Sequence, residues 1–163
     1  MNTIVKDIVH AIKTKELTKD AEKFIIHWLS NEPKTVEDRE IIQQLAISGA
    51  FPTSCDNLFR GCKKLKDGNA ESYSVSVREA ARFAGDDGYV IAVDTSKTNF
   101  YSFDLSEFVW SLVEDIVTGK KENCYSNELI DICEEFSGES EVFLITDLDN
   151  SVVLRVCSMG SKL

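Results

Sequence analysis

The sequence predicts an α+β domain in which helices come first and short strands follow. Apolar residues recur at the helical period through the first 50 residues, and from Phe51 onward the chain changes to short β-type runs. Helices and strands do not alternate regularly, which disfavours a doubly wound parallel sheet. With 163 residues, 43% of them hydrophobic, the chain can bury one sizeable core. We therefore expect a single domain, 1–163, with a helical N-terminal region (1–50) followed by a mixed core (51–163).

Three amphipathic helices are expected in the N-terminal region. Apolar residues at helical spacing mark the first over residues 4–12 and the second over residues 24–29, after a Thr18 cap. Pro33 then breaks the chain. Thr35 and Asp38 form a variant of the capping box, and the third helix runs on to Gly49 as a stop signal.

The core is expected to contain short strands with helices between them. Strands are predicted over 58–60, 72–76, 89–93, 100–103, 142–146 and 152–156. Helices are predicted over 77–84, 105–117 and 127–136. The run Gly85-Asp86-Asp87-Gly88 reads as a turn and not as a dinucleotide loop, because its two acids would repel a pyrophosphate.

Composition excludes several function classes. The formal net charge is -10, from 28 acidic and 18 basic side chains, so the mean field repels phosphate backbones and disfavours nucleic acid as a direct partner. No apolar run is long enough to span a membrane, and no export signal is evident. Both histidines, His10 and His27, fall in helical patterns, and the cysteines include no C-x-x-C pair. We expect a cytoplasmic protein with no metal site, and with reduced thiols at Cys55, Cys62, Cys124, Cys133 and Cys157.

The first of three chemistry-bearing patches is Leu58-Phe59-Arg60-Gly61. Arg60 follows a short apolar run, and its guanidinium presents fixed N–H donors that suit a pyrophosphate. Gly61 would let a ligand approach the backbone closely. The alternative is that Arg60 only pairs with one of the many carboxylates of this chain.

The second patch couples a strand to a helix. Ser72, Ser74 and Ser76 alternate, so they would lie on one face of the strand, and Tyr73 would lie on the other. The helix that follows would bury Ala80, Ala81 and Phe83 against this strand. The alternative is an edge strand with a solvated serine face.

The third patch is Gly138-Glu139-Ser140-Glu141-Val142. Alternation would place Glu139 and Glu141 on one face at the entry of a buried strand, with Ser140 on the opposite face. In so acidic a chain, the alternative is a solvated strand entry. The conjunction of the three patches favours a shared site over three unrelated features.

In this order the patches resemble the arginine-serine-glutamate class of mono-ADP-ribosyltransferases. That class combines an aromatic-Arg-Gly strand, a Ser-x-Ser strand with an Ala-rich helix, and a Glu-x-Glu strand. The resemblance covers about residues 58–156 and is greatest to phage-encoded transferases that modify host proteins. The chain departs from the pattern at Tyr73, in the middle of Ser-x-Ser, and in the short turn over 133–138, which lacks an aromatic-rich extension.

The resemblance implies a split sandwich of two small β-sheets and makes 51–163 an NAD-binding catalytic core. NAD would be a co-substrate whose nicotinamide N-glycosidic bond is cleaved through an oxocarbenium-like state. Arg60 would hold the phosphates, and Glu141 would stabilise the developing ribose cation with support from Ser72. Glu139 would orient and help deprotonate an arginine acceptor. The NAD-binding set is then Arg60, Gly61, Ser72, Tyr73, Ser74 and Glu141.

Aromatic side chains near the patches have two interpretations. Tyr73 and Phe83 could stack on nicotinamide, but a buried ring on a packed helix is more often core, and we assign Phe83 to the core. Trp28 and Trp110 likewise lie on apolar helix faces and are expected in the core or an interface.

Three function classes follow from these residues. The first is a transferase that modifies arginine on a host or partner protein with a basic surface. The second is an NAD glycohydrolase, in which water replaces the protein acceptor. The third is a non-catalytic acidic module that blocks a basic partner, which the net charge of -10 supports.

Overall fold

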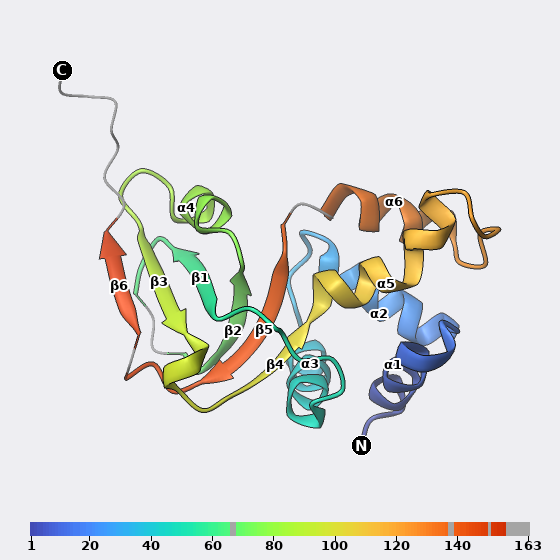
Figure 1. Ribbon diagram of the computed structural model, residues 1–163, viewed down its shortest axis with the longest axis horizontal. Helices are drawn as coiled ribbons and strands as arrows, with labels where there is room; N and C mark the ends of the chain where they lie inside the picture. The colour runs from blue at the N-terminus through green and yellow to red at the C-terminus, as the bar shows by residue number, and fades with distance from the viewer. Residues whose placement is uncertain (66–67, 137–138, 150, 156–163) are drawn as a thin grey trace.

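The structure is a computed structural model that describes residues 1–65, 68–136, 139–149 and 151–155. Within these residues the chain forms six α-helices, a short 3-10 helix (Thr95–Lys97) and six strands (Figure 1). The helices are α1 (Thr3–Thr14), α2 (Lys19–Leu29), α3 (Val36–Ser48), α4 (Val77–Ala84), α5 (Leu105–Val117) and α6 (Asn127–Phe136). The strands are β1 (Asn57–Cys62), β2 (Ala70–Ser74), β3 (Tyr89–Asp94), β4 (Phe100–Asp104), β5 (Glu141–Thr146) and β6 (Val152–Arg155).

The α+β class is confirmed, and the described strands form one antiparallel sheet with the order β4-β5-β2-β1-β3-β6. The two separate small sheets that we expected are not present in the described residues. The sheet is nevertheless weakly joined at its centre, because β1 and β2 share only the Phe59–Ser74 pair there, whereas β2 pairs with β5 over the whole of Ala70–Ser74. The joint divides the sheet into the halves β4-β5-β2 and β1-β3-β6.

The three N-terminal helices form as their local sequence predicts. The Thr18 hydroxyl accepts a hydrogen bond from the backbone N–H of Ala21 at the start of α2. Thr35 and Asp38 make both hydrogen bonds of a capping box at the start of α3. Helix α3 ends at Gly49, which has the left-handed φ of 64° that glycine adopts without strain.

The helices predicted over 77–84, 105–117 and 127–136 are confirmed with the same bounds, and the predicted strands are confirmed with shifted ends. Strand β2 stops at Ser74, because Ser76 caps α4 by accepting a hydrogen bond from the Glu79 N–H at 3.3 Å. Strand β1 continues past Arg60 to Cys62. Helix α6 takes up most of the turn expected over 133–138, since it runs to Phe136. Gly138, Val156 and Cys157 lie outside the described residues.

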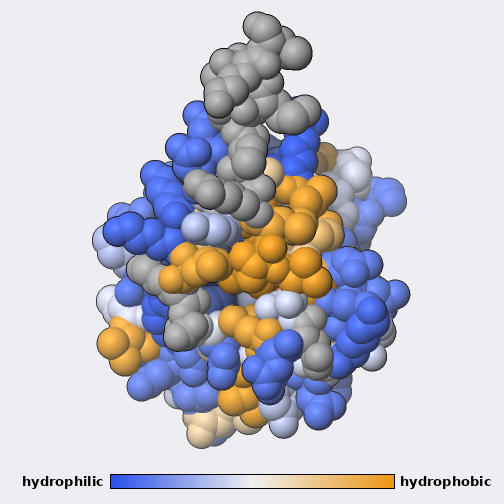
Figure 2. Space-filling model, turned by 90° about the vertical axis from the view of Figure 1, so that its left-hand side faces the viewer, coloured by the Kyte–Doolittle hydropathy of each residue, from blue (hydrophilic) through white to orange (hydrophobic). Residues whose placement is uncertain are grey.

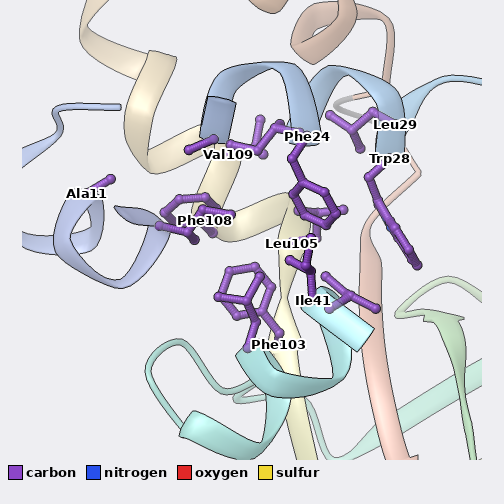
Figure 3. Packing of buried hydrophobic residues seen from close by; sticks show 14 of the residues in the cluster. Ala11, Phe24, Trp28, Leu29, Ile41, Phe103, Leu105, Phe108 and Val109 are labelled. Carbon is purple, nitrogen blue, oxygen red and sulfur yellow. The ribbon is translucent and has the colours of Figure 1, made fainter. Parts of the chain in front are cut away.

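The larger core lies between the helices and one half of the sheet. Helices α1, α2, α3, α5 and α6 surround side chains that β4 and β5 contribute (Figures 1 and 3). Figure 3 shows Phe103 of β4 facing Phe108 of α5, and the two ring centroids are 5.4 Å apart. The N-terminal region therefore packs against the half-sheet β4-β5-β2 and shares its core. The largest fully buried side chains include Phe103, Phe108, Phe143, Ile8, Ile25, Ile42 and Leu45.

Helix α4 packs against the other half-sheet through two glycines that admit no side chain. A Cβ built on Gly61 would lie 1.7 Å from the carbonyl oxygen of Ala80, and one built on Gly88 would lie 2.0 Å from that of Ala84. The expectation that Gly61 leaves room for a ligand is therefore wrong at its Cβ position. The backbone of α4 fills that space and brings the helix down onto β1 and β3.

Phe83, which was assigned to the core, is exposed instead, and Trp110, which was expected in the core or an interface, does not lie in the core. Phe83 is 55% exposed at the end of α4. Trp110 on α5 is 38% exposed. Trp28, by contrast, is buried as expected. Helix α4 instead buries Ala80 of the same apolar pattern.

Strand β6 forms one edge of the sheet and exposes apolar side chains. Val152, Val153 and Leu154 are each about half exposed. Figure 2 shows apolar side chains gathered on the end of the molecule that carries β6. In the part of the chain that the structure describes, no helix combines the length and apolar character needed to cross a membrane.

A candidate ligand-binding cleft

A cleft of about 600 Å³ opens where the two half-sheets meet. Both strands of the weak joint, β1 and β2, contribute to its walls, and so do α4 and the entry of β5. The cleft brings together all seven site residues that the sequence singled out. These are Arg60, Gly61, Ser72, Tyr73, Ser74, Glu139 and Glu141.

Glu141 and Ser72 form the centre of the site. The Ser72 hydroxyl donates a hydrogen bond of 2.6 Å to Oε1 of Glu141, a length typical of an O–H donor on a carboxylate. Glu141 is the first residue of β5 and lies opposite Ser74 of β2, so the paired strands fix both partners. The backbone N–H of Glu141 donates to the hydroxyl of Ser106 on α5 at 2.5 Å, which ties the strand entry to that helix.

Trp28 reaches the same carboxylate from the N-terminal region. Its indole Nε1–H donates to Oε1 of Glu141 at 3.0 Å. Figure 3 shows the Trp28 side chain extending from α2 toward the strands. Sequence reasoning placed Trp28 in the core and missed this contact, because 113 residues separate the two partners and no local motif links them.

Arg60 lies inside the cleft and already has protein partners. Its Nη1 donates to the carbonyl oxygen of Ser72 at 2.9 Å, and its Nη2 is 3.3 Å from Oε2 of Glu71. The side chain stays 29% exposed. The pairing that we raised as an alternative is thus present, and the guanidinium is held on the cleft wall with part of its surface open to a ligand.

Glu139 stands beside Glu141 for a different reason from the one expected. Strand alternation does not apply, because β5 begins at Glu141 and Ser140 has a left-handed φ of 51°. Glu139 precedes the strand, and the Ser74 hydroxyl donates to its carbonyl oxygen at 3.0 Å. Its side chain is 3.4 Å from Nη2 of Arg82, a residue on α4.

The pKa of Glu139 is raised above the ordinary value for glutamate. Burial is the largest cause, and the negative charges of Glu141 and Glu79 add to it, while the neighbouring Arg82 cation lowers the pKa. A carboxylate with a raised pKa is a stronger base than an ordinary one. This property suits a group that takes a proton from a nucleophile.

Aromatic and basic side chains complete the walls. Tyr73 is buried, and burial raises its pKa to about 12, so its hydroxyl stays protonated. Phe83 offers an exposed ring at the cleft. Lys63 and Lys64 also line the cleft, next to Arg60. Sequence reasoning missed the two lysines, for which adjacency to Arg60 was the available signal.

The cleft contains two kinds of charge. Arg60, Lys63 and Lys64 line it with cations that suit phosphate oxygens, and Glu71, the ion-pair partner of Arg60, lines it as well. Glu139 and Glu141 face a ligand with carboxylates, which suit a group that gains positive charge or loses a proton. Within the described ranges, no set of three or more His, Cys, Asp and Glu side chains is arranged to hold a metal ion.

Comparisons with protein-family models, curated proteins and solved structures found no match to this chain. The functional assignment therefore depends on the geometry of the cleft and on the motif resemblance.

Proposed function

We propose that the protein is an NAD-dependent mono-ADP-ribosyltransferase that transfers ADP-ribose to arginine on a partner protein. The observation that carries the proposal is the convergence of Arg60, Ser72 and Glu141 in one cleft, with Ser72 bonded both to Arg60 and to Glu141. These residues come from three strands and lie up to 81 positions apart in the sequence, between Arg60 and Glu141.

The sheet geometry also supports the proposal. The resemblance implies two small sheets that hold NAD between them, and the sheet here is joined at its centre through a single residue pair in the described strands. The cleft opens at that joint. A volume of about 600 Å³ lies within the range of small-molecule and cofactor sites.

Each wall of the cleft would bind a different part of NAD. The pyrophosphate would lie against Arg60, with Lys63 and Lys64 nearby. The nicotinamide ribose would lie at Glu141, whose carboxylate would accept a hydrogen bond from a ribose hydroxyl. Phe83 would offer its exposed ring to one of the two bases of the dinucleotide.

The reaction would break one bond and form one. The bond between the ribose anomeric carbon and the nicotinamide nitrogen would break, and nicotinamide would leave as a neutral molecule with the bonding electron pair. Glu141 would stabilise the positive charge that develops on the ribose, because a fixed carboxylate in a partly dry cleft interacts strongly with it. The acceptor nitrogen would then attack the anomeric carbon and lose its proton to Glu139.

An arginine acceptor is supported by a contact within the chain. The Arg82 guanidinium lies 3.4 Å from Glu139 and 2.9 Å from Glu79, so Glu139 together with Glu79 can hold a guanidinium at the cleft. Arg82 is mostly exposed, and such pairs are weak enough to exchange with another arginine. The net charge of -10 would steer the enzyme toward partners with basic surfaces, such as a host protein in a cytoplasm.

The Arg82–Glu139 contact also favours a second candidate, an NAD glycohydrolase. If no acceptor arginine displaces Arg82, water is the nucleophile left to capture the ribose. The same Arg60, Ser72 and Glu141 would then serve hydrolysis. The third class, a non-catalytic acidic module, rests on net charge alone and requires that NAD is neither bound nor cleaved.

One experiment separates the three classes. The protein is incubated with labelled NAD and a host lysate, and free ADP-ribose is measured against protein-bound ADP-ribose. A transferase labels arginine in protein, and Glu139→Gln reduces that label more than it reduces nicotinamide release. A glycohydrolase yields free ADP-ribose alone. Absence of both products at millimolar NAD contradicts the proposal and favours the acidic module.

A further inference from the structure

We propose that Trp28 is a positioning residue for Glu141, so that the N-terminal helical region forms part of the active site. This inference rests on the proposed function, in which Glu141 stabilises the ribose cation. It assigns a role in the site to helices that otherwise pack against the half-sheet β4-β5-β2.

The hydrogen bonds to Glu141 are unevenly distributed over its two oxygens. Trp28 Nε1 and the Ser72 hydroxyl both donate to Oε1, at 3.0 and 2.6 Å. Two donors on one oxygen fix the orientation of the carboxylate plane. The second oxygen, Oε2, has no donor among the described residues and is left for a ligand hydroxyl. The two donors therefore preorganise the site, because the carboxylate does not have to reorient when positive charge develops on the ribose.

The indole that makes this bond is held firmly. Trp28 is only 6% exposed, and its ring meets the Phe143 ring edge-on, with centroids 6.0 Å apart at 81°. The ring of Phe24, on the same helix, packs against the indole with ring centroids 6.1 Å apart. Lys34 lies 5.9 Å from the ring centroid and donates to backbone carbonyls at the end of α2.

The choice of residue type supports a role beyond packing. A phenylalanine would fill the same apolar space between Phe24 and Phe143, but it has no N–H. A buried indole N–H needs an acceptor, and here the acceptor is the glutamate at the cleft and not a backbone carbonyl. Helix α2 is therefore coupled to the site through a charge-assisted hydrogen bond.

The first test compares Trp28→Phe with the matched control Trp110→Phe. The chain has two tryptophans, and Trp110 lies on α5, is 38% exposed and has no described contact with Glu141. We expect Trp28→Phe to lower kcat for nicotinamide release about 10-fold, with KM for NAD nearly unchanged. Trp110→Phe should retain the wild-type rate. Equal rates for Trp28→Phe and the wild type, with both proteins folded, would overturn the inference while leaving the proposed function intact.

The second test does not depend on activity or on the stability of the Trp28 variant. In the Trp110→Phe variant Trp28 is the one remaining tryptophan, so tryptophan fluorescence reports on Trp28 alone. In that background Glu141→Ala removes the indole's acceptor, and we expect a shift in Trp28 emission, whereas Glu139→Ala should leave the emission unchanged. An unchanged spectrum with Glu141→Ala would overturn the inference. If the wild type releases no nicotinamide, the proposed function fails, and this spectrum still decides whether Trp28 and Glu141 are in contact.

Discussion

Gly61→Ala is expected to disrupt the close packing of helix α4 against strand β1. The added Cβ would lie 1.7 Å from the carbonyl oxygen of Ala80 and 2.8 Å from the backbone nitrogen of Ala84. Both neighbours are backbone atoms, so no side chain can rotate away, and the helix would have to move by more than about 1 Å. Overpacking of this kind costs about 1–3 kcal/mol, and we expect the upper end of that range.

The assay for Gly61→Ala is urea unfolding monitored by tryptophan fluorescence, with Gly119→Ala as the control. Gly119 has a left-handed φ of 76° but nothing within 4 Å of a Cβ, so its substitution costs only backbone strain of about 1 kcal/mol. Because β1 also carries Arg60, Gly61→Ala should weaken NAD binding, and Gly119→Ala should not. The reasoning is refuted if Gly61→Ala unfolds at the same urea concentration as Gly119→Ala.

Three further predictions follow from individual contacts. Thr35→Ala removes the hydroxyl that accepts from the Asp38 backbone N–H, while the backbone N–H of residue 35 can still donate to Asp38. This loss of a cap should lower the free energy of unfolding by about 1 kcal/mol, measured by urea unfolding; no loss would contradict the cap assignment. Because the pKa of Glu139 is raised, its basic form is lost at a higher pH than for an ordinary glutamate. Arginine labelling should therefore fall as pH decreases through that pKa. A labelling rate that stays flat down to the ordinary glutamate range would contradict this prediction. Arg82→Ala removes the cation that lowers the Glu139 pKa, so the acid limb of the pH profile of labelling should move to higher pH. An acid limb at the same pH as in the wild type would show that Arg82 does not act on Glu139.

Local signals in the sequence predicted most of the elements. Capping residues such as Thr18 and Thr35, and stop signals such as Gly49, act through hydrogen bonds within a few residues. Each can therefore be read from the sequence without knowing the fold. The errors at element ends have the same local origin, as when Ser76 caps α4 instead of continuing β2.

Long-range packing could not be predicted in this way. The order of the strands, the single pair that joins β1 to β2, and the close contact of Gly61 with Ala80 depend on how distant segments meet. Phe83 was assigned to the core from its helix, yet its ring is 55% exposed and lines the cleft. The sequence identified seven residues that line one cleft, but it missed Trp28, Lys63 and Lys64.

The most direct test of the account is nicotinamide release from NAD by the wild type and by Glu141→Gln. The substitution keeps the size of the side chain and leaves an oxygen for the Ser72 and Trp28 donors, but it removes the negative charge. We expect the wild type to release nicotinamide and the variant to be slower by at least about 100-fold. Equal rates for the two proteins, or no release by the wild type at millimolar NAD, would contradict the central claim that this cleft cleaves the nicotinamide bond.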